Sequence, residues 1–183
     1  MKIMIYLGLS LFIILGLTSC GNSKPYPQTL NTWKSYKDVS TWMDNNWRFD
    51  VSKTKSIVKQ IRINGPSAGM TKTAEETYNS PSGWCKDGAI FVKETLNKIN
   101  PNYKAQLIFI ENVYGYPHHW VTGFYDKGNL YVMDYSAGPH WSSIMGTHGP
   151  YKSLSEYSLF LESLKVNNFS PSLLTWEDDL GGY

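Results

Sequence analysis

The sequence predicts an α+β domain, because two kinds of apolar pattern follow one another along the chain. Across residues 30–99, apolar side chains recur every three or four positions, which is the spacing of amphipathic helices. Across residues 105–134, short apolar runs of strand length alternate with turn sequences. The last helical pattern before this change has a cysteine at its start. We therefore expect N-terminal helices, with the cysteine helix packed on an antiparallel sheet.

The helical region is divided by polar and turn-forming residues. Asn45 and Asn46 weaken the end of the first pattern, and Asn64-Gly65-Pro66 ends the second. Pro81, Ser82 and Gly83 form a turn before the last helix. The predicted helices are Leu30–Trp47, Ser52–Arg62, Thr73–Tyr78 and the part of Ser80–Ile99 that follows this turn.

The second half of the chain has the patterns of strands. Asn100-Pro101-Asn102 ends the cysteine helix, and Asp126-Lys127-Gly128-Asn129 lies between two apolar runs as a hairpin signature. A stretch rich in Gly, Pro, Ser and His then predicts a long surface loop. We expect strands over Ala105–Ile110, His119–Tyr125 and Leu130–Asp134, a loop over Ala137–Tyr151, a helix over Leu154–Leu164 and an irregular tail over Trp176–Tyr183.

The N-terminus has the features of an export signal. Met1–Ser19 contain one early lysine and an apolar run through Leu17 that is too short for a spanning helix. The run closes with Leu17-Thr18-Ser19-Cys20-Gly21, which resembles the bacterial lipobox. That resemblance implies cleavage before Cys20, lipidation of its thiol and attachment to the cell envelope, at the outer membrane in a Gram-negative cell. An ordinary secretory signal or an N-terminal anchor is the alternative, and in each case the chain leaves the cytoplasm.

Behind this signal (residues 1–19) we expect an extended tether over residues 20–29 and one domain over residues 30–183. Lys and Arg number 17 against 15 for Asp and Glu, so the charge balance does not indicate a nucleic-acid partner. Aromatic residues make up 15% of the chain, which suits a groove that binds peptide or sugar and equally suits a small core.

Cys85 is the candidate nucleophile. The chain has only two cysteines, and lipidation of Cys20 leaves one free thiol in an exported protein. At the first turn of a helix, free amide groups and the helix dipole favour the thiolate. Asp87 in the same turn opposes it, so a basic partner is needed; inert burial in the core is the alternative. The thiol shares its helical stripe with the core-facing residues Ala89, Val92, Leu96 and Ile99.

A histidine and a carboxylate follow on the predicted hairpin. His118 and His119 open one strand, and Asp134 ends the next. A two-residue turn would place Asp134 opposite Val121, on the sheet face of His119. A three-residue turn with a Gly bulge, which the reluctance of Lys127 toward positive φ favours, would place it on the face of His118 instead.

Three blocks of sequence resemble the transglutaminase-like group of papain-like cysteine enzymes: Gly83-Trp84-Cys85-Lys86-Asp87-Gly88-Ala89, His119-Trp120-Val121 and Tyr131-Val132-Met133-Asp134. The resemblance covers about Asp38–Tyr151 and implies a papain-like α+β core with a catalytic triad. Cys85 would be the nucleophile, His119 the base and Asp134 its anchor. The His-Trp-Val strand start favours His119, whereas a His-x-Trp order would favour His118 as the alternate base.

The resemblance also implies an oxyanion site and a substrate groove. The amide of Cys85 is one oxyanion donor, and Asn79, six residues before the nucleophile, is a second candidate. Trp84 and Trp120 would line the groove or belong to the core, and Asp87 would cap the helix or hydrogen-bond nearby backbone. His140 and His148, even with the two strand histidines, lack the spacing of a zinc site, so we expect no metal and no other cofactor.

These observations predict a lipid-anchored thiol enzyme of the cell envelope. It would transfer the acyl group of a peptide or carboxamide substrate through a thioester, with hydrolysis as the favoured outcome. A cross-linking transglutaminase is one alternative. The other is a non-catalytic lipoprotein that uses the same fold to bind peptides or cell-wall fragments.

Overall fold

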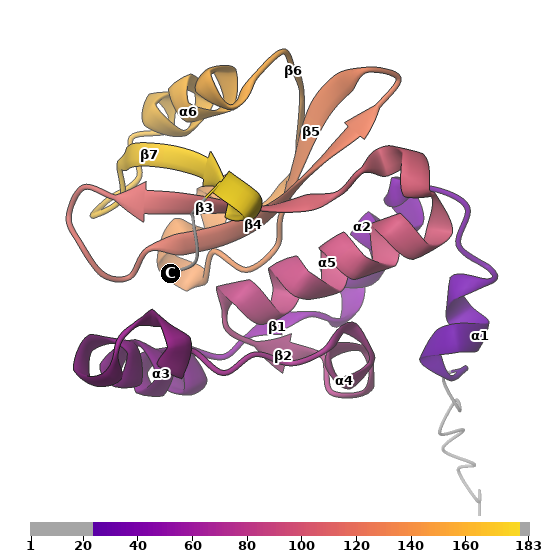
Figure 1. Cartoon of the computed structure of the whole chain (residues 1–183), viewed down its shortest axis with the longest axis horizontal. Coiled ribbons are helices and arrows are strands. Elements are labelled where there is room, and N and C mark those ends of the chain that lie inside the picture. Colours follow the sequence, from indigo (N-terminus) through magenta and orange to yellow (C-terminus); the bar gives the residue numbers. More distant parts are fainter. Residues whose placement is uncertain (1–23, 180–183) are drawn as a thin grey trace, which may run out of the picture.

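The protein, described here from a computed structural model, is an α+β structure in which a sheet separates two groups of helices (Figure 1). The structure describes residues 24–179. The sheet contains five antiparallel strands in the order β6-β5-β4-β3-β7. The helix α6 covers one face, and α5 packs on the other with the N-terminal helices beyond it (Figure 1). The strands are β3 (Gln106–Asn112), β4 (His119–Asp126), β5 (Asn129–Asp134), β6 (Gly146–Tyr151) and β7 (Pro171–Trp176).

The helix α5 (Cys85–Ile99) is the centre of the first core, as its apolar stripe predicts. Ala89, Val92 and Leu96 are all buried, and Phe91 adds a second buried side. Phe124 of β4 completes this core from the sheet. The helix is therefore enclosed on more than one side, which fixes its position against the strands.

The other face of the sheet forms a second core with α6 (Leu154–Ser163). Ile108 and Ile110 of β3 alternate with residues that face α5, as the two-residue period of a strand requires. Tyr157 and Leu161 of α6 are fully buried against them. The two apolar faces explain why the central strands contain so few polar residues.

The remaining helices lie beside and below α5 (Figure 1). A short parallel pair, β1 (Arg48–Phe49) with β2 (Ser82–Gly83), joins the chain before α3 to the start of α5. Short 3₁₀ helices occupy Pro66–Ala68, Pro101–Tyr103, Pro139–Ile144 and Glu177–Asp179. The N-terminal helices are α1 (Tyr26–Leu30), α2 (Tyr36–Asn46), α3 (Val51–Asn64) and α4 (Ala74–Asn79).

The hairpin between β4 and β5 has the two-residue turn. Asp126 pairs with Asn129, and both Lys127 (φ 50°) and Gly128 (φ 82°) adopt positive φ. This is the backbone of a type I′ turn, whose twist matches that of the strands. The reluctance of lysine toward positive φ was therefore a wrong guide, and Asp134 lies on the sheet face of His119.

Two predictions about irregular segments were wrong. The expected loop over Ala137–Tyr151 contains the 3₁₀ helix at Pro139 and the edge strand β6. The strand β7, which ends at the start of the expected tail, was not predicted. The tether was expected to stay extended through Thr29, but α1 begins at Tyr26, whose side chain is 2% exposed and hydrogen-bonds Thr95 at 2.8 Å. The first predicted helix, Leu30–Trp47, is correspondingly shorter, because Leu30 ends α1 and α2 covers Tyr36–Asn46.

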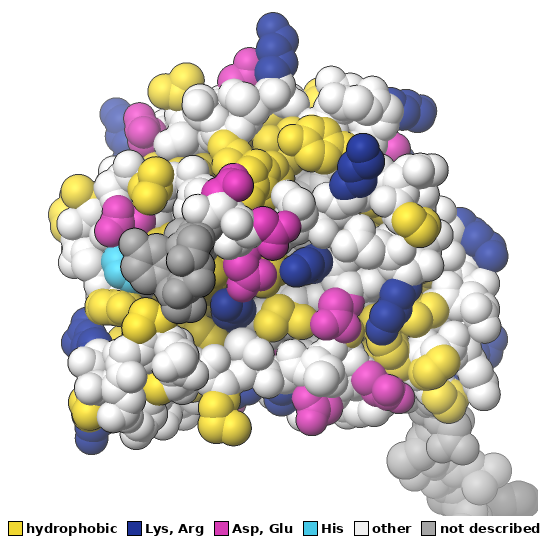
Figure 2. All heavy atoms as spheres, in the orientation of Figure 1, with side chains coloured by type: hydrophobic (Ala, Val, Ile, Leu, Met, Phe, Trp, Pro, Cys, Tyr) yellow, Lys and Arg dark blue, Asp and Glu magenta, His cyan; other side chains and the backbone are white. Residues whose placement is uncertain are grey.

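The described part of the chain has a surface of mixed charge and helices that are short or polar. On the face shown in Figure 2, Lys and Arg side chains are interspersed with acidic ones, in keeping with the net charge of +2. Within residues 24–179, the helices are too short or too polar to cross a lipid bilayer. The export signal expected at the N-terminus lies outside the described residues.

Gly88 lies where α5 packs tightly against Ser136 and Trp47, so a larger residue at this position should destabilise the fold. A Cβ atom at this position would lie 2.1 Å from Ser136 Oγ and 3.1 Å from the Trp47 ring. Although alanine is the better helix former by about 1 kcal/mol, we expect Gly88→Ala to lower the free energy of unfolding by about 1–3 kcal/mol. Urea unfolding measures this, and Gly88→Ala/Ser136→Ala should recover part of the loss. An unchanged or increased stability for Gly88→Ala would contradict the packing.

Candidate active site

Cys85 lies at the start of α5, outside the two large apolar cores. Cys85 is the first residue of the helix, so its amide has no acceptor within the preceding turn. The Asp87 carboxylate folds back and accepts a hydrogen bond from the Trp84 amide at 3.1 Å. A Cβ atom on Gly83 would lie 2.2 Å from that carboxylate, so glycine is required there. Asp87 thus caps the helix, as expected from its place in the sequence.

The His119 imidazole and the Asp134 carboxylate form a buried pair. His119 Nε2 and Asp134 Oδ2 are 2.7 Å apart, and the two side chains are 1% and 0% exposed. The other carboxylate oxygen accepts from the Ser136 amide at 3.1 Å, which fixes its orientation. Because both oxygens have partners, the carboxylate can in turn hold the imidazole in one orientation.

The electrostatics of this pair favour the imidazolium. Burial by itself lowers the pKa of His119, because a charged ring loses its hydration. The charge and hydrogen bond of Asp134 outweigh that effect, and the nearby Cys85 raises the pKa of His119 further. The pKa of His119 is therefore raised well above its ordinary value of 6.5. Cys85 and His119 also line the same cavity, so the structure brings all three sequence-predicted residues together.

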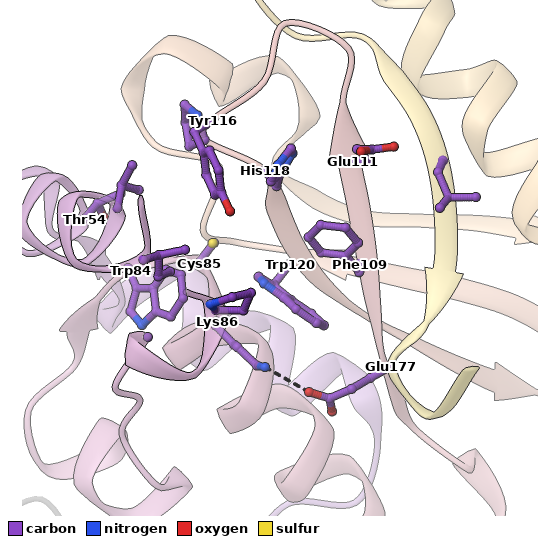
Figure 3. A pocket seen from close by; sticks show the side chains of 16 residues that line it. Thr54, Trp84, Cys85, Lys86, Phe109, Glu111, Tyr116, His118, Trp120 and Glu177 are labelled. Carbon is purple, nitrogen blue, oxygen red and sulfur yellow. Dashed lines mark ion pairs between the residues drawn. The ribbon is translucent and has the colours of Figure 1, made fainter. Parts of the chain in front are cut away.

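His118 occupies a different environment. Its Nδ1 accepts a hydrogen bond from the Asn112 amide at 3.2 Å, so it does not pair with Asp134. Burial lowers the pKa of His118, and the Glu111 carboxylate opposes this only in part. The ring lines both cavities next to Cys85 (Figure 3). His118 is thus beside the sulfur as a neutral ring, while His119 has the carboxylate partner.

Two cavities meet at the cysteine, each of about 470 Å³. Both are lined by Thr54, Cys85, Tyr116, Pro117 and His118. The Cys85 sulfur points into the space between α3 and the strands, and the Tyr116 side chain extends toward it (Figure 3). A substrate that spans both cavities would therefore cross the sulfur.

The first cavity has an aromatic wall. Phe109 and Trp120, which face each other on β3 and β4, pack with ring centroids 5.0 Å apart. Lys86 Nζ lies 4.0 Å from the Trp120 ring centroid and 2.9 Å from Glu177, as the dashed contact in Figure 3 shows. Trp84 lines the same cavity, although its side chain is only 5% exposed. Trp84 and Trp120 thus both line the cavity beside the cysteine.

The second cavity contains residues that the sequence did not connect to the site. Asn112 and Ser136 line it together with the loop residues Asn167 and Asn168, and His140 lines it as well. The His119 ring makes edge contacts with Trp141 and Phe169, at centroid distances of 5.7 and 6.2 Å. Neither aromatic ring gave a sequence signal, because both lie in irregular segments far from His119 along the chain.

One predicted site residue is not at the site. Asn79, the second candidate oxyanion donor, ends α4 with an exposed side chain and lines neither cavity. That assignment was wrong, because α4 stops before β2 carries the chain to the cysteine. In the described residues 24–179, no group of three or more His, Cys, Asp or Glu side chains could hold a metal ion.

A thiol at a helix start beside a buried His–Asp pair is the arrangement of papain-like cysteine enzymes. The comparison with known families agrees: the model of the family described as "Transglutaminase-like domain" matches residues 25–143. This protein belongs to that transglutaminase-like family. Domains of this family generally have cysteine-based acyl-transfer activity. No curated protein matches the chain.

The opposite pKa shifts of the two histidines predict opposite pH effects on stability. A raised pKa means that His119 stabilises the fold below its unfolded value of about 6.5, and that this contribution is lost as pH rises toward the folded value. The lowered pKa of His118 gives a contribution that is present above about 6.5 and lost as pH falls.

We therefore expect the stability difference between wild type and His119→Gln to shrink between pH 6 and 9. The difference between wild type and His118→Gln should instead grow from pH 5 to 7. Urea unfolding at stepped pH values measures both. Parallel pH curves for wild type and His119→Gln would show that the Asp134 pair does not charge the ring.

Proposed function

We propose that this protein is a thiol enzyme that transfers the acyl group of a peptide or carboxamide through a thioester on Cys85. The observation that supports this most directly is the buried 2.7 Å contact between His119 and Asp134, next to a cysteine at a helix start. A protein that only bound ligand would have no need to bury an ion pair there, because a buried pair contributes little net stability.

The roles follow from the geometry. The raised pKa of His119 favours a resting imidazolium beside the Cys85 thiolate. The thiolate attacks the substrate carbonyl carbon, and the negative charge moves to the carbonyl oxygen. The free amide of Cys85, at the positive end of the α5 dipole, is placed to donate to that oxygen.

The tetrahedral intermediate then collapses with transfer of one proton. His119 gives its proton to the leaving amine, the C–N bond breaks, and a thioester to Cys85 remains. His119, now neutral, accepts a proton from the second substrate as that substrate attacks the thioester. Asp134 holds the ring in one orientation through both steps.

We propose water as the second substrate, so that the reaction is hydrolysis. Asn112, Ser136 and His140 line the second cavity beside His119, where they can hydrogen-bond water and a peptide backbone. The aromatic wall of the first cavity suits the apolar part of a peptide. A primary amine in place of water would give cross-linking instead, and the experiment below distinguishes these outcomes.

We also propose that Cys20 is lipidated and holds the enzyme at the envelope membrane. The support is the sequence Leu17-Thr18-Ser19-Cys20-Gly21 alone. Because the folded part begins with α1 at Tyr26, the six residues from Cys20 span at most about 20 Å. The enzyme would therefore work close to the membrane surface.

Lipidation predicts a mass and partitioning change that depends on one residue. Protein expressed in a bacterium should enter the detergent phase of a Triton X-114 separation and carry acyl chains on Cys20 by mass spectrometry. The Cys20→Ala variant should keep its leader or appear in the aqueous phase. Wild-type protein that is processed elsewhere and partitions into water would exclude the anchor.

The proposed catalysis predicts which residues determine the reactivity of the Cys85 thiol. Iodoacetamide at mildly acidic pH should label Cys85 rapidly, and His119→Ala should slow this strongly, whereas His118→Ala should leave most of the rate. In a peptide-library assay read by mass spectrometry, Cys85→Ala should reduce turnover by roughly 10⁴-fold or more. Products that gain water indicate hydrolysis, and products that incorporate an added amine indicate transamidation.

The proposed enzymatic function would be rejected by two results together. Wild-type Cys85 would label slowly and at the same rate in His119→Ala, and peptides would bind without turnover. These results would favour the binding lipoprotein.

A further inference from the structure

A second buried carboxylate lies in the first turn of α5, and the proposed reaction does not use it. Asp87 is two residues after Cys85, and its side chain is 0% exposed. A negative charge so close to a thiolate is unexpected, because like charges disfavour each other in a low-dielectric environment. The contacts of this carboxylate show how the conflict is resolved.

Two backbone amides hold the carboxylate. Oδ1 accepts from the Lys72 amide at 2.7 Å, and Oδ2 accepts from the Trp84 amide at 3.1 Å. These contacts join the segment before α4 to the residue immediately before the nucleophile. Together with the close approach of Gly83, they define the turn from which the sulfur projects.

One side chain neutralises the carboxylate. Lys53 Nζ lies 2.6 Å from Asp87 Oδ2, and among residues 24–179 no other side chain forms an ion pair with it. The Lys72 ammonium is directed elsewhere, to the carbonyl oxygens of Ser80 (2.9 Å) and Ser82 (2.7 Å).

Two other charged groups near the cysteine have partners of their own: Lys86 pairs with Glu177, and His119 pairs with Asp134. Lys55 lines the second cavity and Glu111 the first, and within residues 24–179 neither forms an ion pair. His118 lies beside the sulfur with a lowered pKa, as a neutral ring. Lys53 is therefore the cation that determines whether Asp87 acts on the thiolate as an uncompensated negative charge or as part of a neutral pair.

Lys53 also attaches a wall of the groove to the nucleophile. It lies in the first turn of α3, the helix whose Thr54 and Val58 line the first cavity. The helix has little core of its own, since Ile57 is its one buried residue. Its packing on the cysteine side is limited to the small cluster with Trp84 and Cys85. The ion pair thus connects α3 to the turn that presents the sulfur.

We propose that Lys53 and Asp87 are positioning residues for Cys85. Asp87 shapes the turn through its amide contacts, and Lys53 cancels the charge of Asp87 so that the thiolate persists near neutral pH. This inference rests on the proposed function, because only a reacting thiolate needs that neutralisation. It names a residue of α3, which no sequence motif connects to the site.

The test is the pH dependence of iodoacetamide alkylation on the full chain, followed at the Cys85 peptide by mass spectrometry. We expect Lys53→Gln to move the midpoint of the rate profile upward by on the order of one pH unit. Lys53→Arg should restore a profile close to that of wild type. Lys59→Gln is the matched control, because it removes the same charge from an exposed position of α3 that does not contact Asp87.

A double variant separates charge from shape. Lys53→Gln/Asp87→Asn removes both charges and retains the side-chain oxygen for an amide contact, so its midpoint should return toward the wild-type value. Thermal unfolding of each variant reports stability independently. A Lys53→Gln profile that coincides with wild type while the unfolding temperature falls would make the pair purely structural. A shift that persists in the double variant would reject the electrostatic role.

The same experiment distinguishes a failure of the proposed function from a failure of this inference. If wild-type Cys85 reacts only with the alkaline profile of an ordinary thiol, the enzyme itself is rejected. If wild type reacts rapidly at mildly acidic pH and Lys53→Gln does the same, only the role of Lys53 and Asp87 is rejected.

Discussion

The contact between α5 and β4 is the constraint on which the whole site depends. Thr122 Oγ1 donates to the Ala89 carbonyl at 2.6 Å, deep between helix and sheet. Cys85 lies four residues before this contact along the helix, a rise of about 6 Å. His119 lies three residues before it along the strand, about 10 Å away. The sulfur and the imidazole thus come from the starts of two elements that cross at this buried contact, where α5 has the small residue Ala89.

Much of this arrangement could be predicted from the sequence because the responsible signals are local. The stripe from Cys85 to Leu96 predicts both the helix and its buried side, and the hairpin signature at Lys127 and Gly128 predicts the neighbouring strands. The turn type could not be decided, because it depends on how strongly β4 and β5 pair around Lys127. The structure shows that this pairing overrides the local preference of lysine.

The parts that could not be predicted depend on partners distant in the chain. The strand β6 contains Gly146, Gly149 and Pro150, which indicate a loop in isolation, yet it pairs with β5 across a register shift. The strand β7 lies at the opposite edge and pairs with β3, from which it is separated by about sixty residues. The role of Lys53 could not be predicted either, because no sequence pattern relates it to a carboxylate on another helix.

Two acid–base pairs flank the cysteine, each with a buried carboxylate. His119 with Asp134 links β4 to β5, and Lys53 with Asp87 links α3 to α5. Removing the basic partner of either pair leaves a buried carboxylate without its counter-charge, which costs far more than the intact pair contributes. Such pairs are a poor means of increasing stability, but they define orientation well, because each charge has few acceptable positions. The apolar cores hold the sheet and helices together, and the two ion pairs orient the segments that surround the Cys85 sulfur.

The two cavities meet at Cys85 but offer a substrate different side chains. An extended substrate that passes over Cys85 would place one part against Phe109 and Trp120, where burial of apolar surface supplies binding energy. Its other part would lie in the second cavity, where Asn112, Ser136 and His140 can replace hydrogen bonds to water. His119 lines the second cavity and not the first. In the proposed reaction, the leaving group that takes the proton of His119 would therefore depart through the second cavity, and the acyl part would stay on Cys85 against the aromatic wall.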